Sequence, residues 1–134
     1  MFLLDTDTII YSLKGNHAVK RNLQDHFEDP MKICVITLME LYFGAYRSKK
    51  MTGNLSKVRA IENAFEIVSV NSECADIFGM LKASLRKSGM SLDDFDLIIA
   101  SCAMTNNLTL VTNNIKHFRR IDGLKLTDWT AHPE

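Results

Sequence analysis

Short apolar runs alternate with longer helical patterns along this 134-residue chain, and this alternation constrains the fold more than any other feature. The predicted strands are Phe2–Leu4, Ile33–Ile36, Ile67–Val70 and Leu108–Val111, with a weaker one at Leu124–Leu126. The predicted helices are Thr8–Lys14, Ala18–Phe27, Leu38–Lys49, Leu55–Phe65, Ser72–Lys87 and Leu92–Thr105. Strands that alternate with helices predict a three-layer α/β/α fold, with a central, mostly parallel sheet of four to five strands.

Composition and charge fit one globular domain over residues 1–134. Lys+Arg and Asp+Glu balance at 16 each, so any nucleic-acid contact needs locally segregated charge. Cys34, Cys74 and Cys102 are odd in number and widely spaced, which predicts buried free thiols rather than disulfides or a zinc site. The chain has no signal-peptide pattern and no apolar run near the ~18 residues of a membrane span, so we expect a cytoplasmic protein without a membrane partner.

Polar residues follow three of the predicted strands at the point where each strand ends. Asp5 follows the first strand, Thr37 the second, and Thr112-Asn113-Asn114 the run "LTLV". Ligands of parallel α/β sheets bind beyond the carboxyl ends of the strands. These residues therefore indicate a site at that edge, although Asp5 and Asp7 also suit the start of a helix.

Glu40 lies on a predicted helix that is apolar on two sides. One face holds Leu38, Leu41, Tyr42 and Ala45, and the other holds Met39, Phe43 and Tyr46. A covered carboxylate is costly unless it is paired or binds a metal, and the alternative is an exposed glutamate between two packed faces. We expect the second face to be buried within the domain, with a partner surface as the alternative.

The stretch "SLDDFDLIIASCAM" supplies a third set of acids. Ser91 and Asp94 fit a capping box, and Asp93 and Asp94 suit the first turn of a helix. Asp96 lies deeper, with Phe95 before it and apolar residues after it, so it is the functional candidate of this stretch.

Asp5, Glu40 and Asp96 would repel one another if the fold brought them together, unless a cation compensates their charge. Carboxylate-only ligation favours Mg²⁺ or Mn²⁺ over zinc. Such an ion lowers the pKa of bound water and neutralises charge on phosphorus, which predicts a phosphodiester hydrolase.

Four blocks of the sequence resemble PIN-domain ribonucleases, and more narrowly the VapC toxins of bacterial toxin–antitoxin pairs. They are "LLDTDTIIYSLKG", "ITLMELYFGAYRS", "GMSLDDFDLIIASCAM" and "LTLVTNNIKHFRRIDGLKLTDW", and they span about residues 3–129. The resemblance implies a Mg²⁺- or Mn²⁺-dependent endoribonuclease that acts on RNA, is inhibited by a cognate VapB-like antitoxin and forms a homodimer.

The family's acidic triad falls on Asp5, Glu40 and Asp96, which are the expected catalytic and metal-binding residues. The fourth acidic position of the family is the neutral Asn114 here, which puts a second tightly held metal in doubt. We predict that Thr6 and Asn114 contact the substrate.

Two other functions remain open at this point. "LLDTDT" also fits the D-x-D-x-T motif of haloacid-dehalogenase-type phosphatases, with Asp5 as nucleophile and Asp7 as general acid, although Glu40 would then have no role. A non-enzymatic module that only binds a structural ion is the third alternative.

Three basic groups are phosphate-binding candidates or simply solvated helix ends. They are Arg47/Lys49/Lys50, Lys116/His117/Arg119/Arg120 and, as the least favoured set, Lys82/Arg86/Lys87.

Overall fold

The computed structural model describes residues 1–130, and a five-stranded parallel sheet forms its centre. The strands are β1 (Phe2–Leu4), β2 (Met31–Cys34), β3 (Glu66–Val68), β4 (Thr109–Val111) and β5 (Leu126–Thr127). Their order is β3-β2-β1-β4-β5, and all four neighbouring pairs are parallel. The predicted fold class is therefore confirmed.

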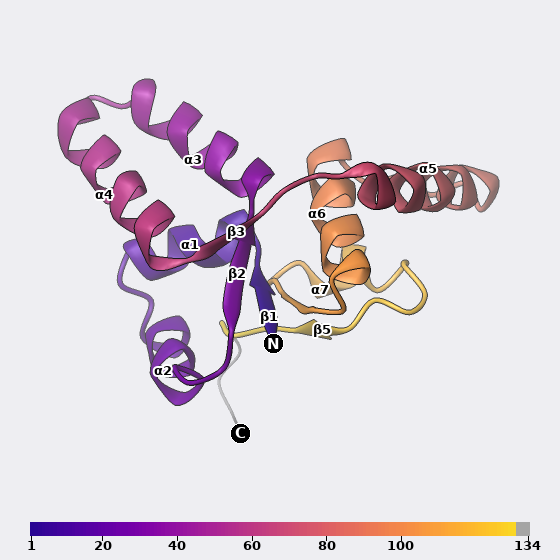
Figure 1. The fold of residues 1–134 in the computed structure, drawn as a ribbon, viewed down its shortest axis with the longest axis horizontal. Helices are drawn as coiled ribbons and strands as arrows, with labels where there is room; N and C mark the ends of the chain where they lie inside the picture. Colours follow the sequence, from indigo (N-terminus) through magenta and orange to yellow (C-terminus); the bar gives the residue numbers. More distant parts are fainter. Residues whose placement is uncertain (131–134) are drawn as a thin grey trace.

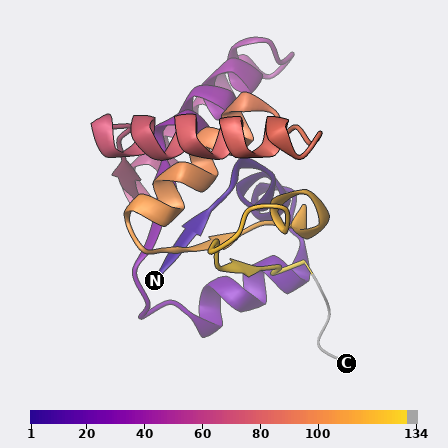
Figure 2. The same cartoon turned by 90° about the vertical axis from the view of Figure 1, so that its right-hand side faces the viewer.

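Helices cover both faces of the sheet. They are α1 (Thr6–Leu13), α2 (His17–Asp25), α3 (Val35–Tyr46), α4 (Met51–Ala64), α5 (Ser72–Lys87), α6 (Asp94–Thr105) and α7 (Ile115–Phe118). Figure 1 shows α1 to α4 on one side of the sheet and α5 to α7 on the other. Figure 2 shows α5 lying across α6, so that α6 lies between α5 and the sheet. Within residues 1–130, no helix has the length and apolarity needed to cross a bilayer.

The central strands send alternate side chains into two separate cores, as the period of two residues along a strand requires. Leu3 packs in the core beneath α5 and α6, whereas its neighbour Leu4 packs in the core beneath α1, α3 and α4. In β2, Cys34 packs in the same core as Leu3, and Ile33 packs in the same core as Leu4. These strands are thus buried on both faces, which explains why they read as continuous apolar runs.

Most of the predicted elements lie where the sequence places them, and the errors are at their ends. β1 and α5 match their predicted bounds. β2 ends at Cys34 rather than Ile36, because α3 begins directly at Val35 and leaves no loop between the two. The four-residue α7 was not predicted, since it is too short for a helical pattern to show.

The three cysteines are free and buried, as predicted. They also meet one another, because Cys102 Sγ on α6 lies 3.5 Å from Sγ of both Cys34 and Cys74. These thiols join the end of β2, the first turn of α5 and the middle of α6 in one core.

Candidate active site

Asp5 stands at the carboxyl end of β1 and also begins α1. Its Oδ1 accepts a hydrogen bond from the Thr8 backbone N at 2.8 Å, so Asp5 is the N-cap of this helix. The side chain is only 5% exposed, and burial raises its pKa, opposed by hydrogen bonds from Thr112 and Thr8. A carboxylate has two oxygens, so a capping oxygen leaves the second one for a ligand. The two interpretations of Asp5 are therefore compatible.

Glu40 is held from across the sheet edge by the first residue of α1. The Thr6 hydroxyl donates to Glu40 Oε1 at 2.7 Å, and it lies 3.2 Å from the Thr37 hydroxyl. Burial raises the pKa of Glu40, and the Thr6 hydrogen bond partly offsets this. Glu40 is neither fully exposed nor fully covered, and the space beside Gly44 is open, as the small residue predicted.

Asp96 lies in the first turn of α6 among other acids. Burial raises its pKa to about 6, and the charges of Asp93, Glu40, Asp5 and Asp7 contribute in that order. The acid at the end of β1, the acid of α3 and the acid of α6 are thus close enough for their charges to interact. These five residues are called the acidic cluster below.

The start of α6 differs from the predicted capping box. Asp93 is the N-cap and accepts from the Phe95 backbone N at 3.2 Å, so Ser91 is not the cap. Asp94 is the first residue of the helix and pairs with Lys82 Nζ at 2.9 Å. The prediction was wrong by two residues, because each of several adjacent polar residues can cap a helix.

The acidic cluster has the donor chemistry of a divalent-cation site but not a closed ligand shell. Within residues 1–130, no three acidic, histidine or cysteine side chains lie close enough to ligate one ion. The cluster offers hard carboxylate oxygens, and burial together with repulsion among them raises the pKa of Asp96. Both properties fit Mg²⁺ or Mn²⁺, which accept few protein ligands and retain water.

The turn after β4 contributes polar side chains whose hydrogen bonds are largely internal. The Asn114 backbone N donates to Thr112 Oγ1 at 3.0 Å, and its side-chain oxygen contacts the His117 ring. The Asn113 amide donates to the Tyr11 hydroxyl at 3.1 Å. A substrate contact from Asn114 stays a prediction, and the side-chain amide N–H groups, which the His117 contact does not use, are the groups that would make it.

The second apolar face of α3 is exposed, so the expectation that the domain buries it was wrong. Met39, Phe43 and Tyr46 are 53%, 67% and 58% exposed. A groove of about 660 Å³ runs along this face and is lined by Thr6, Glu40, Phe43 and, from α6, Phe95. The acidic cluster therefore borders an apolar groove. We call it the α3 groove.

Two contributors to the site, Asp93 and Phe95, are not among the predicted site residues. Asp93 is the charge with the largest effect on the pKa of Asp96, and Phe95 closes the α3 groove while 43% exposed. The spacing of Asp93 and Asp96, three residues apart on a helix, was the available signal.

The fold and the site define the class of protein. The PIN domain profile matches residues 2–124, so this chain belongs to the PIN-domain family and the predicted resemblance is confirmed. A haloacid-dehalogenase-type phosphatase is accordingly set aside.

The similar proteins within that class are VapC nucleases. Ribonuclease VapC2 of Rickettsia felis is 36% identical over 131 residues, covering 96% of this chain and 98% of the relative. The tRNA(fMet)-specific endonuclease VapC of Salmonella typhimurium is 34% identical over 128 residues, covering 96% and 97%.

Solved structures give the same picture. A chain of VapBC2 from Rickettsia felis, bound to a fragment of promoter DNA, has a TM-score of 0.90 at 35% identity and covers 96% of this chain and 98% of its own. A chain of DNA-bound VapBC from Salmonella typhimurium has a TM-score of 0.89 at 32% identity, with 96% and 97% covered.

Proposed function

We propose that this protein is a cytoplasmic endoribonuclease toxin of the VapC type, dependent on Mg²⁺ or Mn²⁺, in which residues 1–134 form one PIN-like domain. The observation that carries the proposal is the gathering of acids from β1, α3 and α6 at one edge of the sheet, where Thr6, next to Asp5, donates to Glu40 and where Glu40 and Phe95, the neighbour of Asp96, line one groove. Burial and the charges of Asp93, Glu40 and Asp5 raise the pKa of Asp96, which agrees with this gathering. The relatives named as ribonucleases and endonucleases support the same reaction class.

Asp5 and Asp96 would hold the metal ion, and Glu40 would bind it or orient the attacking water. The bound ion supplies an activated water and neutralises charge that develops on phosphorus. Thr8 fixes Asp5 through its backbone N, and Thr6 fixes Glu40 through its hydroxyl, so both carboxylates are positioned before substrate arrives. Thr6 and Asn114 are the proposed substrate contacts.

The α3 groove is the proposed docking site of a VapB-like antitoxin. Relatives of known structure were solved as VapBC complexes. The groove offers exposed Met39 and Phe43 directly beside Glu40, so a partner lying in it would also cover the acidic cluster. A homodimer is proposed from the resemblance to VapC alone, without an assigned surface.

The test of the nuclease proposal is cleavage of total RNA by purified protein with Mn²⁺, with mapping of the cut ends. Asp96→Asn is expected to reduce the cleavage rate at least about 100-fold, because it removes a metal ligand without changing side-chain size. Asp76→Asn, on the exposed side of α5, is the matched control and should cleave like wild type.

Mn²⁺ should also raise the melting temperature of wild type, corresponding to roughly 2.7 kcal/mol when the ion is present at 100 times its Kd. Full cleavage by Asp96→Asn, or cleavage that EDTA does not stop, would refute the assignment. Metal stabilisation without any RNA cleavage would instead favour the non-enzymatic module.

A further inference from the structure

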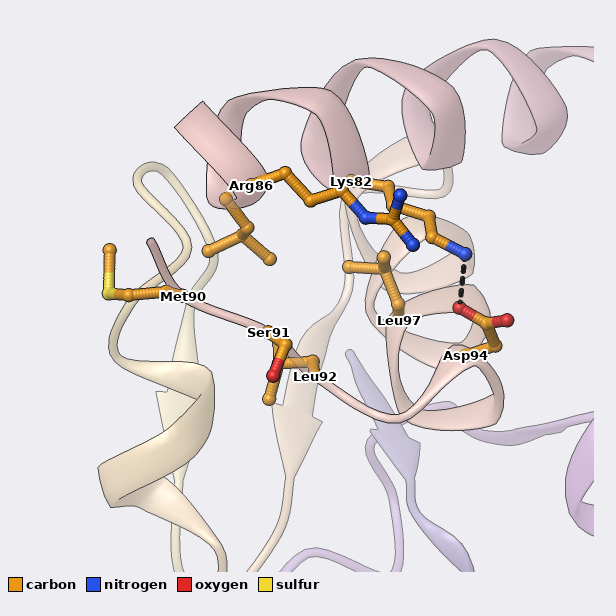
Figure 3. A pocket seen from close by; sticks show the side chains of 8 residues that line it. Lys82, Arg86, Met90, Ser91, Leu92, Asp94 and Leu97 are labelled. Carbon is orange, nitrogen blue, oxygen red and sulfur yellow. Dashed lines mark hydrogen bonds and ion pairs between the residues drawn. The ribbon is translucent and has the colours of Figure 1, made fainter. Parts of the chain in front are cut away.

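A pocket of about 260 Å³ lies between α5 and the start of α6, outside the acidic cluster (Figure 3). Its rim carries two cations from α5, Lys82 and Arg86, and its partly exposed apolar side chains are Met90 and Leu92, backed by the buried Leu97. A cationic rim over an apolar wall is complementary to a nucleotide, whose phosphate is charged and whose base is flat and largely apolar. We call it the α5–α6 pocket.

The charges at the rim are not fully used within the protein. Lys82 pairs with Asp94 at 2.9 Å, but their side chains are 35% and 57% exposed, and such surface pairs are worth only about 0–1 kcal/mol. An incoming phosphate can therefore replace Asp94 at little cost. The ion pairs within residues 1–130 involve His26, Lys32 and Lys82, so Arg86 has no carboxylate partner there. In Figure 3, Lys82 and Arg86 both extend from α5 toward the first turn of α6.

The pocket and the acidic cluster share that first turn. Asp94 and Leu97, three residues apart, line the pocket, whereas Asp93 and Asp96, also three apart, belong to the acidic cluster. Residues three apart lie on one face of a helix, so the two sites flank α6 on different faces. A helix with its side chains is about 10 Å across, which is the span of a short piece of nucleic-acid strand.

The wall of the pocket is also fixed in place. Arg120, at the end of α7, donates from Nη1 to the Ser91 carbonyl at 3.1 Å and holds the segment that leads into α6. Lys82 Nζ lies 5.6 Å from the centre of the Phe78 ring, which restrains its side chain on α5. The volume is slightly below the roughly 300–1,000 Å³ of pockets for drug-sized ligands, and it suits a single base.

We infer that the α5–α6 pocket binds one unpaired nucleotide of the RNA strand next to the scissile phosphate, with its phosphate on Arg86 and Lys82 and its base against Met90 and Leu92. The inference rests on the proposed nuclease function and assigns a role to Lys82 and Arg86, two members of the basic set that the sequence favoured least. It also implies a preference for single-stranded RNA, because a paired base cannot turn into a pocket.

The test is binding of a short, fluorescein-labelled, single-stranded RNA of mixed sequence in EDTA, measured by fluorescence anisotropy over a range of salt concentrations. Arg86→Ala should weaken binding roughly tenfold and reduce the salt slope by about 0.7, the loss of one phosphate contact on a single strand. Lys87→Ala is the matched control, since it removes one positive charge from the adjacent exposed position outside the pocket. It should change the affinity less than about twofold.

Further measurements distinguish RNA binding by the pocket from a loss of folding and from the proposed nuclease activity. Arg86→Lys should recover most of the affinity, and an RNA duplex should not distinguish Arg86→Ala from Lys87→Ala. Equal behaviour of the two alanine variants on single-stranded RNA would overturn the inference. Because binding is measured without metal, a wild type that binds RNA through Arg86 but never cleaves it would refute the nuclease proposal and leave the pocket assigned.

Discussion

Helices α3 and α6 deliver carboxylates to the same edge of the sheet from opposite sides, yet they are built differently. In α6 the residues after Asp96 are almost all buried, including Leu97, Ile99 and Ala100. In α3 only one face is buried, and the other exposes Met39 and Phe43.

The difference teaches how stability and recognition divide between the two helices. Six of the nine α6 residues after Asp96 are buried, so Asp96 is presented by a helix that packs closely in the core. α3 exposes the apolar side chains of Met39, Phe43 and Tyr46, and an exposed apolar face carries a cost in water that a partner can remove. The site therefore combines a helix that packs in the core, α6, with a helix that carries the proposed partner surface, α3.

The largest expected contrast is in folding stability. Leu97→Ala should reduce the free energy of unfolding by about 2–5 kcal/mol, because it opens a cavity in a close-packed core. Phe43→Ala should change it by less than about 0.5 kcal/mol, because the ring is 67% exposed. Urea unfolding of the protein alone measures both, and similar losses would erase the distinction between the helices.

The next contrast is in partner affinity. Phe43→Ala should weaken binding of a co-expressed VapB-like antitoxin by more than about tenfold, because an aromatic residue in the groove would be a central contact. Phe27→Ala removes an even more exposed ring that does not line the α3 groove, and it is the matched control. Titration calorimetry with purified partners measures the effect, and equal affinities for both variants would assign the antitoxin to another surface.

The smallest expected effect is a pH dependence of stability, to which Asp96 on α6 contributes most. The folded pKa of Asp96 is about 6 against an ordinary value of 3.8, so between these values the folded protein holds a proton that the unfolded chain has lost. The metal-free protein should therefore become more stable as the pH falls from 7 to 5. Partial exposure of Asp96 limits the gain to a few degrees in melting temperature.

Asp96→Asn should be more stable than wild type at pH 7 and nearly insensitive to pH over the same range. A wild type that loses stability between pH 7 and 5 would show that the burial of Asp96 and its repulsion by other acids do not control this behaviour. Glu40 and Asp5 shift in the same direction, so a residual slope in the variant is expected from them.

The sequence predicted the sheet, most helices and the acids of the site because those signals are local. An apolar run such as Phe2–Leu4 and the spacing within "SLDDFDLIIASCAM" are properties of adjacent residues. The exposure of Phe43 was not predictable in this way, because a face of a helix is covered or open according to elements distant in sequence. The same holds for the α5–α6 pocket, where Lys82 and Leu92 meet only after the chain folds.

Asp5 has two roles, because the same side chain is the N-cap of α1 and a proposed metal ligand. Asp5→Ala would remove a proposed metal ligand. It would also remove the N-cap of α1, a helix that lines the α3 groove, and so reduce the free energy of unfolding by about 1 kcal/mol. Asparagine caps helices as well as aspartate does, so Asp5→Asn removes the negative charge but keeps the N-cap. A homologue that lost nuclease activity through Asp5→Asn would therefore stay folded and would still bind an antitoxin in the α3 groove.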